Sequence, residues 1–330
     1  MLNSDIPHLR TIDIVIYPEF KSFEAIGPMT VFTYANKHLE AQDREPGYKV
    51  RIVSTKLGPV VSDTLMTLTA SHTLGEVPLP HSVMVVGAHE IERIVEEQPE
   101  IVEWTKRVAL NVERFAALCS GAFFLAEAGL LNGKRATTHW RMAEVMKQNY
   151  PEIQVDIDSI FVRQDNLWTS AGVSASVDLA LAFVESDFGH DLALQVARDL
   201  VIFLKRPGGQ SQFSANLKTQ MTQSPNMRSI QEWVLNNIDK KIGISLMASR
   251  ASMSLRHFTR TFQKDVGMCP SEFLERARID KARRLLSESE LPLKSIAFNC
   301  GFSTTDQMRI SFRKHLSVTP KEYRERFLSV

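Results

Sequence analysis

The sequence is poor in cysteine and in long apolar runs, and these absences exclude several classes of protein. Its 330 residues include three cysteines, far apart and in no paired spacing, so we expect neither a disulfide framework nor a zinc site. The longest apolar runs have five or six residues, whereas a membrane helix needs roughly 20. The first 15 residues hold polar and charged residues where a secretion signal needs an apolar core. We therefore expect a cytoplasmic protein.

Motifs for phosphates and metals are also missing. The chain has no Walker motif and no pair of histidines at ligand spacing, so we expect no metal, nucleotide, flavin or other cofactor. Its 15 glycines and 14 prolines are ordinary proportions, which excludes collagen-like and disordered chains. What remains is a globular chain, long enough at roughly 150 residues per domain for two domains.

The net charge of +1 conceals two segments of opposite sign. Residues 226–330 contain 19 Lys and Arg against 11 Asp and Glu, a net of +8, and the rest of the chain has 20 against 27, a net of −7. A basic domain favours a phosphate-bearing partner, which the acidic segment would repel. The alternative is a basic surface without such a partner.

Strand-like and helix-like segments alternate through the first 200 residues. Short β-branched and apolar runs typical of buried strands lie at 11–17, 48–54, 82–87 and 114–119. Helical stretches such as 91–111 separate them, and two apolar-faced helices follow at 174–189 and 191–205. The alternation predicts an α/β domain over residues 1–205, with a flavodoxin-like parallel sheet covered by helices on both faces. Ligands of such folds usually bind at the carboxyl ends of the strands.

The segment 206–225 is rich in Gly, Pro, Ser and Gln and has no sustained apolar period, so we interpret it as a linker. No strand signal follows it. Residues 226–330 are predicted to form an all-α domain of seven helices, at 226–239, 244–251, 255–266, 271–287, 293–299, 304–315 and 319–327.

The C-terminal segment matches itself at an offset of 49 and then 50 residues. Each copy is predicted to be a short helix, a tight turn and a second helix, which gives the domain two helix-turn-helix motifs. The second copy has Gly301 at its turn, where a left-handed conformation costs glycine little. The first copy has Ser252 at this position, which predicts strain or a different turn.

The second helix of the first copy shows an apolar and a polar face. Leu255, Phe258 and Phe262 are spaced to form the buried face. A solvated polar face is the alternative for any one helix, but two such motifs in a basic domain favour DNA binding. The opposite stripe holds side chains that can bind base edges or phosphates, namely Arg256, Thr259, Arg260 and Gln263.

The second copy has a weaker stripe, because Asp306 stands in the place of Arg256 and Ile310 in the place of Arg260. We expect it to bind the DNA backbone, with Ile310 against a thymine methyl. The helix between the copies has about 18 residues and a length of roughly 27 Å, close to the roughly 34 Å between successive major-groove segments. The second set of predicted DNA contacts is Thr305, Asp306, Arg309, Ile310, Arg313 and Lys314.

On these motifs, residues 244–324 resemble the AraC-type DNA-binding domain. MSLRHFTRTF resembles its first recognition helix, and IAFNCGFSTTDQMRISFRKHLSVTPKEYR resembles its second half. The sequence departs from the family at Ser252, where glycine is usual, and at Ile310, where arginine is frequent. The resemblance implies a transcription regulator that binds promoter DNA, and we expect an activator that works with RNA polymerase.

In the first domain, RFAALCSGAFFLAEAGLL predicts a strand, a sharp turn at Cys119 and a helix, a geometry that stabilises a thiolate. With IYPEFKSFEAIGPMTVF, KRATTHW, LWTSAGVSASVDLAL and FLKRPGGQSQF, it resembles the PfpI/ThiJ-like (class I glutamine amidotransferase-like) domain of GlxA-type regulators of the AraC family. The resemblance implies an acid near the thiol, at Glu24, and a histidine directly after it. Ser120 occupies that place, and His139 lies 20 residues beyond Cys119.

Three interpretations of the first domain remain open: a ligand sensor, a structural or dimerising domain, and a PfpI-like cysteine hydrolase or glyoxalase with a DNA-binding tail. We favour a sensor in a homodimer that pairs through this domain, because the adjacent catalytic base is missing. An acid with an aromatic ring would suit a quaternary amine, and the resemblance implies amino acids, betaines and similar nitrogen compounds as effectors. The predicted ligand-binding residues are Glu24, His89, Cys119, Ser120, His139, Trp140 and Ser170.

Overall fold

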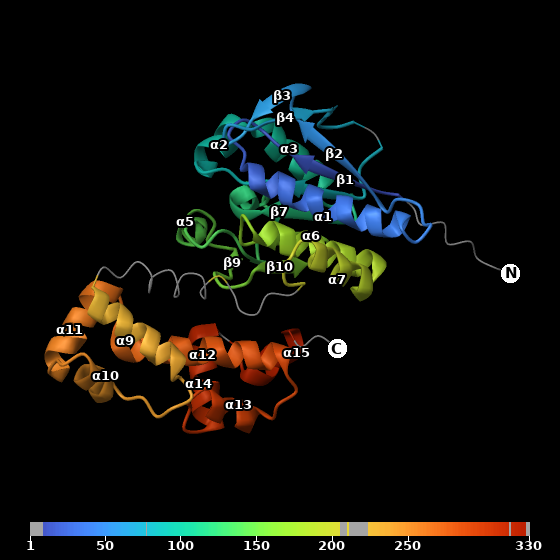
Figure 1. The fold of residues 1–330 in the computed structure, drawn as a ribbon. Helices are drawn as coiled ribbons and strands as arrows, with labels where there is room; N and C mark the ends of the chain where they lie inside the picture. Colours follow the sequence, from blue (N-terminus) through green and yellow to red (C-terminus); the bar gives the residue numbers. More distant parts are fainter. Residues whose placement is uncertain (1–8, 77, 205–209, 211–223, 317, 328–330) are drawn as a thin grey trace. The chain divides into compact units, whose positions relative to one another are not determined.

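The computed structural model describes residues 9–76, 78–204, 210, 224–316 and 318–327. The chain divides into two compact units, Met1–Arg206 and Pro207–Val330, and each is described by itself (Figure 1). The predicted linker at 206–225 lies outside the described residues, apart from Gln210, Ser224 and Pro225. No helix among the described residues is both long and apolar enough to cross a membrane.

The first unit is built on a mostly parallel sheet with strand order β10-β11-β7-β6-β1-β2-β5. Only the pairing of β10 with β11 is antiparallel. The fold class predicted for this domain is therefore confirmed. The strands of this sheet are β1 (Arg10–Val15), β2 (Tyr48–Ser54), β5 (His72–Thr73), β6 (Ser82–Val85), β7 (Arg114–Leu118), β10 (Phe161–Gln164) and β11 (Leu167–Ser170).

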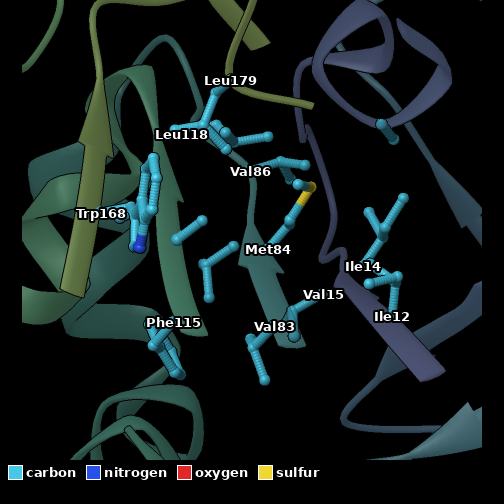
Figure 2. Packing of buried hydrophobic residues seen from close by; sticks show 14 of the residues in the cluster. Ile12, Ile14, Val15, Val83, Met84, Val86, Phe115, Leu118, Trp168 and Leu179 are labelled. Atoms are coloured by element: carbon cyan, nitrogen blue, oxygen red, sulfur yellow. The ribbon is translucent and has the colours of Figure 1, made fainter. Parts of the chain in front are cut away.

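The central strands are buried along most of their length because both faces of the sheet are covered. Every residue of β6 and β7 is buried, which matches the continuous apolar runs of these segments. Figure 2 shows the packing of neighbouring strands, with Ile14 of β1, Met84 of β6 and Phe115 of β7 in one cluster. The parallel registers bring the carboxyl ends of β1, β6, β7 and β11 to the same edge of the sheet.

Two groups of helices accompany the sheet. The helices α1 (Ser22–Glu40), α6 (Ala175–Phe188) and α7 (His190–Asp199) pack on one another, as do α2 (Ile91–Glu97), α3 (Pro99–Val108) and α4 (Ala122–Glu127). The unit also contains α5 (Ala143–Asn149) and two small sheets, formed by β3 (Gly58–Val61) with β4 (Thr67–Ala70) and by β8 (Arg135–Ala136) with β9 (Gln154–Val155).

Residues 224–316 and 318–327 of the second unit form seven helices and no strand, as the apolar periodicity predicts. Their ends lie close to the predicted ones because the signals are local: the side chain of Ser254 caps α11 by accepting from His257 N–H, and prolines begin three other helices. The helices are α9 (Pro225–Asn236), α10 (Ile244–Arg250), α11 (Leu255–Val266), α12 (Pro270–Glu288), α13 (Leu293–Asn299), α14 (Thr305–Leu316) and α15 (Pro320–Phe327).

Two separate hydrophobic clusters hold this unit together. One contains residues of α9, α10, α11 and the first part of α12, with Phe258, Phe262 and Phe273 at its centre. The other contains residues of the second part of α12, α13, α14 and α15, with Phe312 against Tyr323. The long helix α12 is thus shared, and each helix-turn-helix motif has its own core.

Candidate functional site

The predicted sharp turn at Cys119 is present at the carboxyl end of β7. Cys119 has φ +56° and begins a 3-10 turn that leads into α4. A left-handed conformation is unfavourable for a residue with a side chain. Such strain is common at functional positions because it aims one side chain away from the strand.

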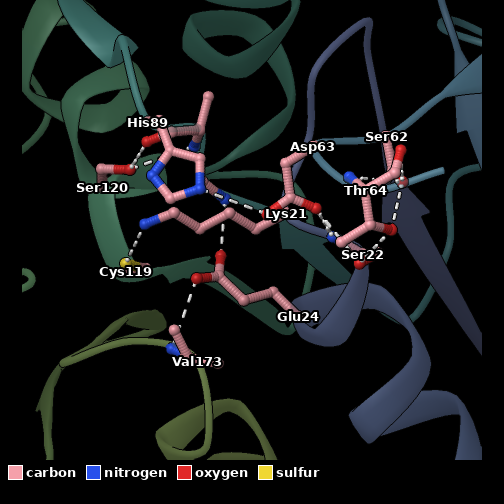
Figure 3. Close-up of polar contacts among 12 residues, drawn as sticks. Lys21, Ser22, Glu24, Ser62, Asp63, Thr64, His89, Cys119, Ser120 and Val173 are labelled. Atoms are coloured by element: carbon pink, nitrogen blue, oxygen red, sulfur yellow. Dashed lines mark hydrogen bonds and ion pairs between the residues drawn. The ribbon is translucent and has the colours of Figure 1, made fainter. Parts of the chain in front are cut away.

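Figure 3 shows the polar contacts of the Cys119 side chain. Lys21 Nζ lies 3.2 Å from Cys119 Sγ and donates to it. Glu24, on the next turn of the chain at the start of α1, is fully buried, and its carboxyl oxygens accept from Gly87 N–H at 2.7 Å and Val173 N–H at 3.3 Å. Glu24 thereby joins α1 to the loop after β6 and to the loop after β11.

The environment of the thiol opposes ionisation. Burial raises the pKa of Cys119 to about 12; the charge of Glu24 adds to the increase, and Lys21 acts against it. The turn geometry had led us to expect a stabilised thiolate, and this expectation is wrong in direction because burial of the sulfur and the charge of Glu24 outweigh the effect of Lys21 on the pKa. Burial also raises the pKa of Glu24.

His139 lies beside Cys119, although 20 residues separate them. A Cβ placed on Gly172 would lie 2.7 Å from Cys119 Sγ and 3.0 Å from His139 Cδ2, so all three residues adjoin. Gly172 has φ +123°, a conformation that side-chain-bearing residues rarely adopt. No hydrogen bond joins His139 to Cys119 in the described part of the chain. Burial lowers the pKa of His139 to about 4, with contributions from the charges of Lys21, Arg141 and His89.

The remaining predicted ligand residues differ in exposure. Ser120 is fully buried, and its hydroxyl donates to Ala88 C=O at 2.7 Å. The side chain of His89 is 73% exposed and lies 3.3 Å from the Asp63 carboxylate. Trp140 is 43% exposed, and Ser170 is buried with no hydrogen-bond partner for its hydroxyl in the described structure.

The structure therefore brings Glu24, Cys119, Ser120 and His139 to one place, with His89 and Trp140 on the exposed side. Sequence reasoning missed Lys21, which contacts the thiol directly. Its signal was its position three residues before Glu24, since Lys21 ends the loop that follows β1 and Glu24 lies in the first turn of α1. Asp63 was missed as well, because it belongs to the β3–β4 hairpin, which was not predicted.

The first helix-turn-helix motif consists of α10, a turn and α11. Ser252 has φ +55° in this turn, so the predicted strain is present. Phe258 and Phe262 are fully buried, but Leu255 is 51% exposed and its prediction as part of the buried face is wrong. Leu255 is the first residue of α11, where no neighbouring helix covers it. Three of the predicted DNA contacts on this helix are exposed, namely Arg256, Arg260 and Gln263. The fourth, Thr259, is half-buried, and its hydroxyl donates to the backbone C=O of Leu255.

The second motif consists of α13, a turn with Gly301 at φ +75°, and α14. A Cβ at Gly301 would collide with the backbone oxygen of Ile238, so this turn requires glycine. Two cations of the predicted stripe are paired within the protein, Arg309 with Asp306 at 3.0 Å and Lys314 with Glu275 at 2.8 Å. Of the other predicted contacts on α14, Thr305 is half-buried and Arg313 is exposed. The side chain of Ile310 is 61% exposed.

Among residues 9–76, 78–204, 210, 224–316 and 318–327, no group of three or more His, Cys, Asp or Glu side chains is arranged to hold a metal ion.

Comparison with known proteins adds to this geometry. The DJ-1/PfpI family matches residues 10–186, and a helix-turn-helix domain family matches residues 247–326. The transcriptional regulator CdhR of Pseudomonas aeruginosa is 28% identical over 281 residues, which cover 84% of this chain and 82% of that protein. The transcriptional regulator GlxA of Rhizobium meliloti is 27% identical over 282 residues, which cover 85% of this chain and 86% of that protein.

An enzyme is also similar to part of the chain. The isonitrile hydratase of Pseudomonas putida is 27% identical over 190 residues, which cover 57% of this chain and 77% of that protein. The two regulators match over a larger share of the chain and have the helix-turn-helix label in their names. The chain belongs to the DJ-1/PfpI family, as one of the AraC-type, DNA-binding transcriptional regulators that join such a domain to a C-terminal helix-turn-helix domain.

Proposed function

We propose that the chain is a one-component transcription regulator whose first unit binds a small metabolite and thereby changes how the second unit binds promoter DNA. The observation that carries the DNA side is the free polar face of α11. Arg256 and Arg260 are exposed and have no ion pair or hydrogen bond to another side chain in the described structure, while Phe258 and Phe262 fix the opposite face in the core.

The two helix-turn-helix motifs contact different parts of the DNA. The guanidinium groups of α11 are available for guanine O6 and N7, so this helix reads bases. In α14 the cations Arg309 and Lys314 have acidic partners, which weakens their attraction to DNA and suits backbone contacts. Ile310 presents an apolar side chain among polar neighbours and contacts a thymine methyl.

A sensing role for the first unit is supported by the state of its thiol. A cysteine nucleophile needs a thiolate and a base within hydrogen-bond reach. Burial raises the pKa of Cys119 to about 12, and the neutral His139 makes no hydrogen bond to it in the described structure. The second candidate, a PfpI-like cysteine hydrolase or glyoxalase with a DNA-binding tail, is favoured by the strained turn at Cys119 and by the similarity to isonitrile hydratase. Turnover that Cys119→Ser abolishes would support it.

A homodimer through the first unit is part of the proposal. The β3–β4 hairpin exposes apolar side chains that a second copy would cover. A metabolite acts on such a dimer by binding one arrangement of the DNA-binding units better than another. The exposed apolar residues in and beside the hairpin are Leu57, Val61, Leu65 and Met66.

The experiment that tests the function starts from the full chain. Random duplexes enriched by the protein supply an operator, and a gel shift then measures affinity with and without each member of a metabolite panel. Binding that weakens steeply with salt and changes with one metabolite class supports the proposal. Enrichment of no sequence, or affinity that no metabolite changes, contradicts it. Transcription in vitro with RNA polymerase tests the expected activation.

A further inference from the structure

Glu275 of α12 binds three side chains of α14, the second helix of the second helix-turn-helix motif. Its carboxylate accepts from the Ser311 hydroxyl and from Lys314 Nζ, each at 2.8 Å. The same carboxylate lies 3.0 Å from His315 Nε2. The three partners are spaced i, i+3 and i+4, so they share one face of α14. One carboxylate thus holds the C-terminal half of this helix against α12.

The apolar packing of α14 is shorter than that of α11. Three apolar residues are buried along α11, the last of them Val266. On α14 the buried apolar residues are Met308 and Phe312, while Leu316, at the place of Val266, is only partly buried. A helix held by two side chains on one line can rotate about that line. A contact on a neighbouring face is therefore needed to fix its orientation, and Glu275 supplies that contact.

The described residues of the first motif show no equivalent contact. The places of the three partners are occupied there by Thr261, Lys264 and Asp265. Lys264 is exposed, and its side chain has no ion pair or hydrogen bond within the described structure. Asp265 is itself an acid and would repel a carboxylate. The contact is thus confined to the motif whose recognition helix has the shorter apolar packing.

The face that Glu275 binds adjoins the face predicted to meet DNA. Ile310 directly precedes Ser311, and Arg313 directly precedes Lys314; both Ile310 and Arg313 are exposed. A rotation of α14 about its axis would move these two side chains together relative to the bases, and such contacts tolerate only small displacements. A carboxylate beside a recognition helix also repels phosphates. Its presence here is unfavourable for DNA binding unless it serves a contact inside the protein.

We propose that Glu275 is a positioning residue for base recognition, which fixes the rotation of α14 through Ser311, Lys314 and His315. The inference rests on the proposed function, because it concerns how the same domain recognises its operator. Burial raises the pKa of Glu275, but hydrogen bonds led by the one from Lys314 outweigh burial and hold this pKa at about 2. The carboxylate is therefore ionised at neutral pH, and its hydrogen bonds are charge-assisted.

The test separates positioning from charge and from stability. The full chain and its variants bind two duplexes in fluorescence anisotropy at one salt concentration: the enriched operator, and the same operator with the half-site of α14 replaced by unrelated sequence. The half-site of α11 is the one at which Arg260→Ala relaxes base preference, so the other belongs to α14. The Kd for the replaced duplex divided by the Kd for the operator measures what base recognition by α14 contributes.

Glu275→Gln keeps the size of the side chain and removes its charge. We expect the Kd ratio to fall by at least about fivefold, the lower limit for the loss of one base contact. Affinity for the replaced duplex should stay equal or rise, because a negative charge near the phosphates is lost. A positioning role thus lowers the ratio without weakening the binding of unrelated sequence, which neither a charge effect nor unfolding can do.

Two further variants accompany this one. Glu272→Gln is the matched control, since Glu272 lies about one turn earlier on α12 and pairs with Arg276 of the same helix at 2.9 Å. It loses the same charge and should leave the Kd ratio unchanged. Ser311→Ala removes one of the three contacts without changing the charge, and it should lower the ratio in part.

Two results with folded Glu275→Gln protein would overturn the proposal: an unchanged Kd ratio, or an equal loss of affinity for both duplexes. If Glu275→Gln does not fold, Ser311→Ala decides, and an unchanged ratio in that variant counts equally against the proposal. Enrichment of no sequence contradicts the proposed function and this inference with it. An operator that Glu275→Gln binds with the original ratio contradicts the positioning role alone.

Discussion

Arg260→Ala tests the central claim about α11. The side chain is exposed and has no partner within the described structure, so its loss removes no internal contact. The free energy of unfolding should change by no more than about 0.5 kcal/mol. Loss of an arginine that reads a base should cost about 1–3 kcal/mol of binding, which raises the Kd for the enriched operator by about 5- to 150-fold.

The assay is fluorescence anisotropy with the enriched operator and with single-base variants of it, at one fixed salt concentration. Arg260→Lys is the matched variant, because lysine keeps the charge and loses the bidentate geometry. A base contact predicts that lysine restores little affinity, and a phosphate contact predicts that it restores most. Arg107→Ala, an exposed change in the first unit, should leave affinity unchanged. A folded Arg260→Ala protein with unaltered affinity and base preference would refute the assignment.

Four further predictions concern stability and are checked by unfolding the full chain. Ser252→Gly should raise the free energy of unfolding by up to about 1 kcal/mol because φ +55° is unfavourable for serine, and Gly301→Ala, at φ +75°, should lower it by more than about 1 kcal/mol; the opposite signs would contradict the assigned turns. Phe262→Ala should cost about 3–5 kcal/mol and abolish DNA binding, since the ring is fully buried; a loss below about 1 kcal/mol would argue against this core. Burial raises the pKa of Glu275, but hydrogen bonds led by the one from Lys314 outweigh burial and hold this pKa at about 2. The ionised Glu275 therefore stabilises the fold above pH 4.5, and this stabilisation is lost as the pH falls toward 2. Glu275→Gln should remove this part of the pH dependence of unfolding, and a variant with an unchanged pH profile would contradict the role of Glu275.

The helices of the second unit were predictable because their signals lie within a few residues of each end. Pro225, Pro270 and Pro320 are first residues of helices, and Ser254 caps α11. The same reasoning failed at Leu255, where spacing alone assigned a buried side chain. Periodicity gives the face of a residue and not whether the neighbouring element extends far enough to cover it.

The site in the first unit was predictable only in part. The turn at Cys119 follows from a strand, small residues and a helix in succession, so local sequence indicates it. The contact of Lys21 with Cys119 joins residues 98 positions apart, and its existence depends on the parallel order of β1, β6 and β7. The direction of the Cys119 pKa shift could not be predicted either, because it depends on how completely the surrounding loops exclude water from the sulfur.

The two hydrophobic clusters of the second unit have a consequence for how such regulators change over evolutionary time. Since each helix-turn-helix motif packs on its own core, substitutions that alter α14 leave the support of α11 in place. A duplicated motif with this arrangement can drift in one copy while the other retains its target. The difference between the arginines of α11 and the paired cations and isoleucine of α14 is the result expected of such drift, and it gives a lineage of regulators a route to new operators through one half-site at a time.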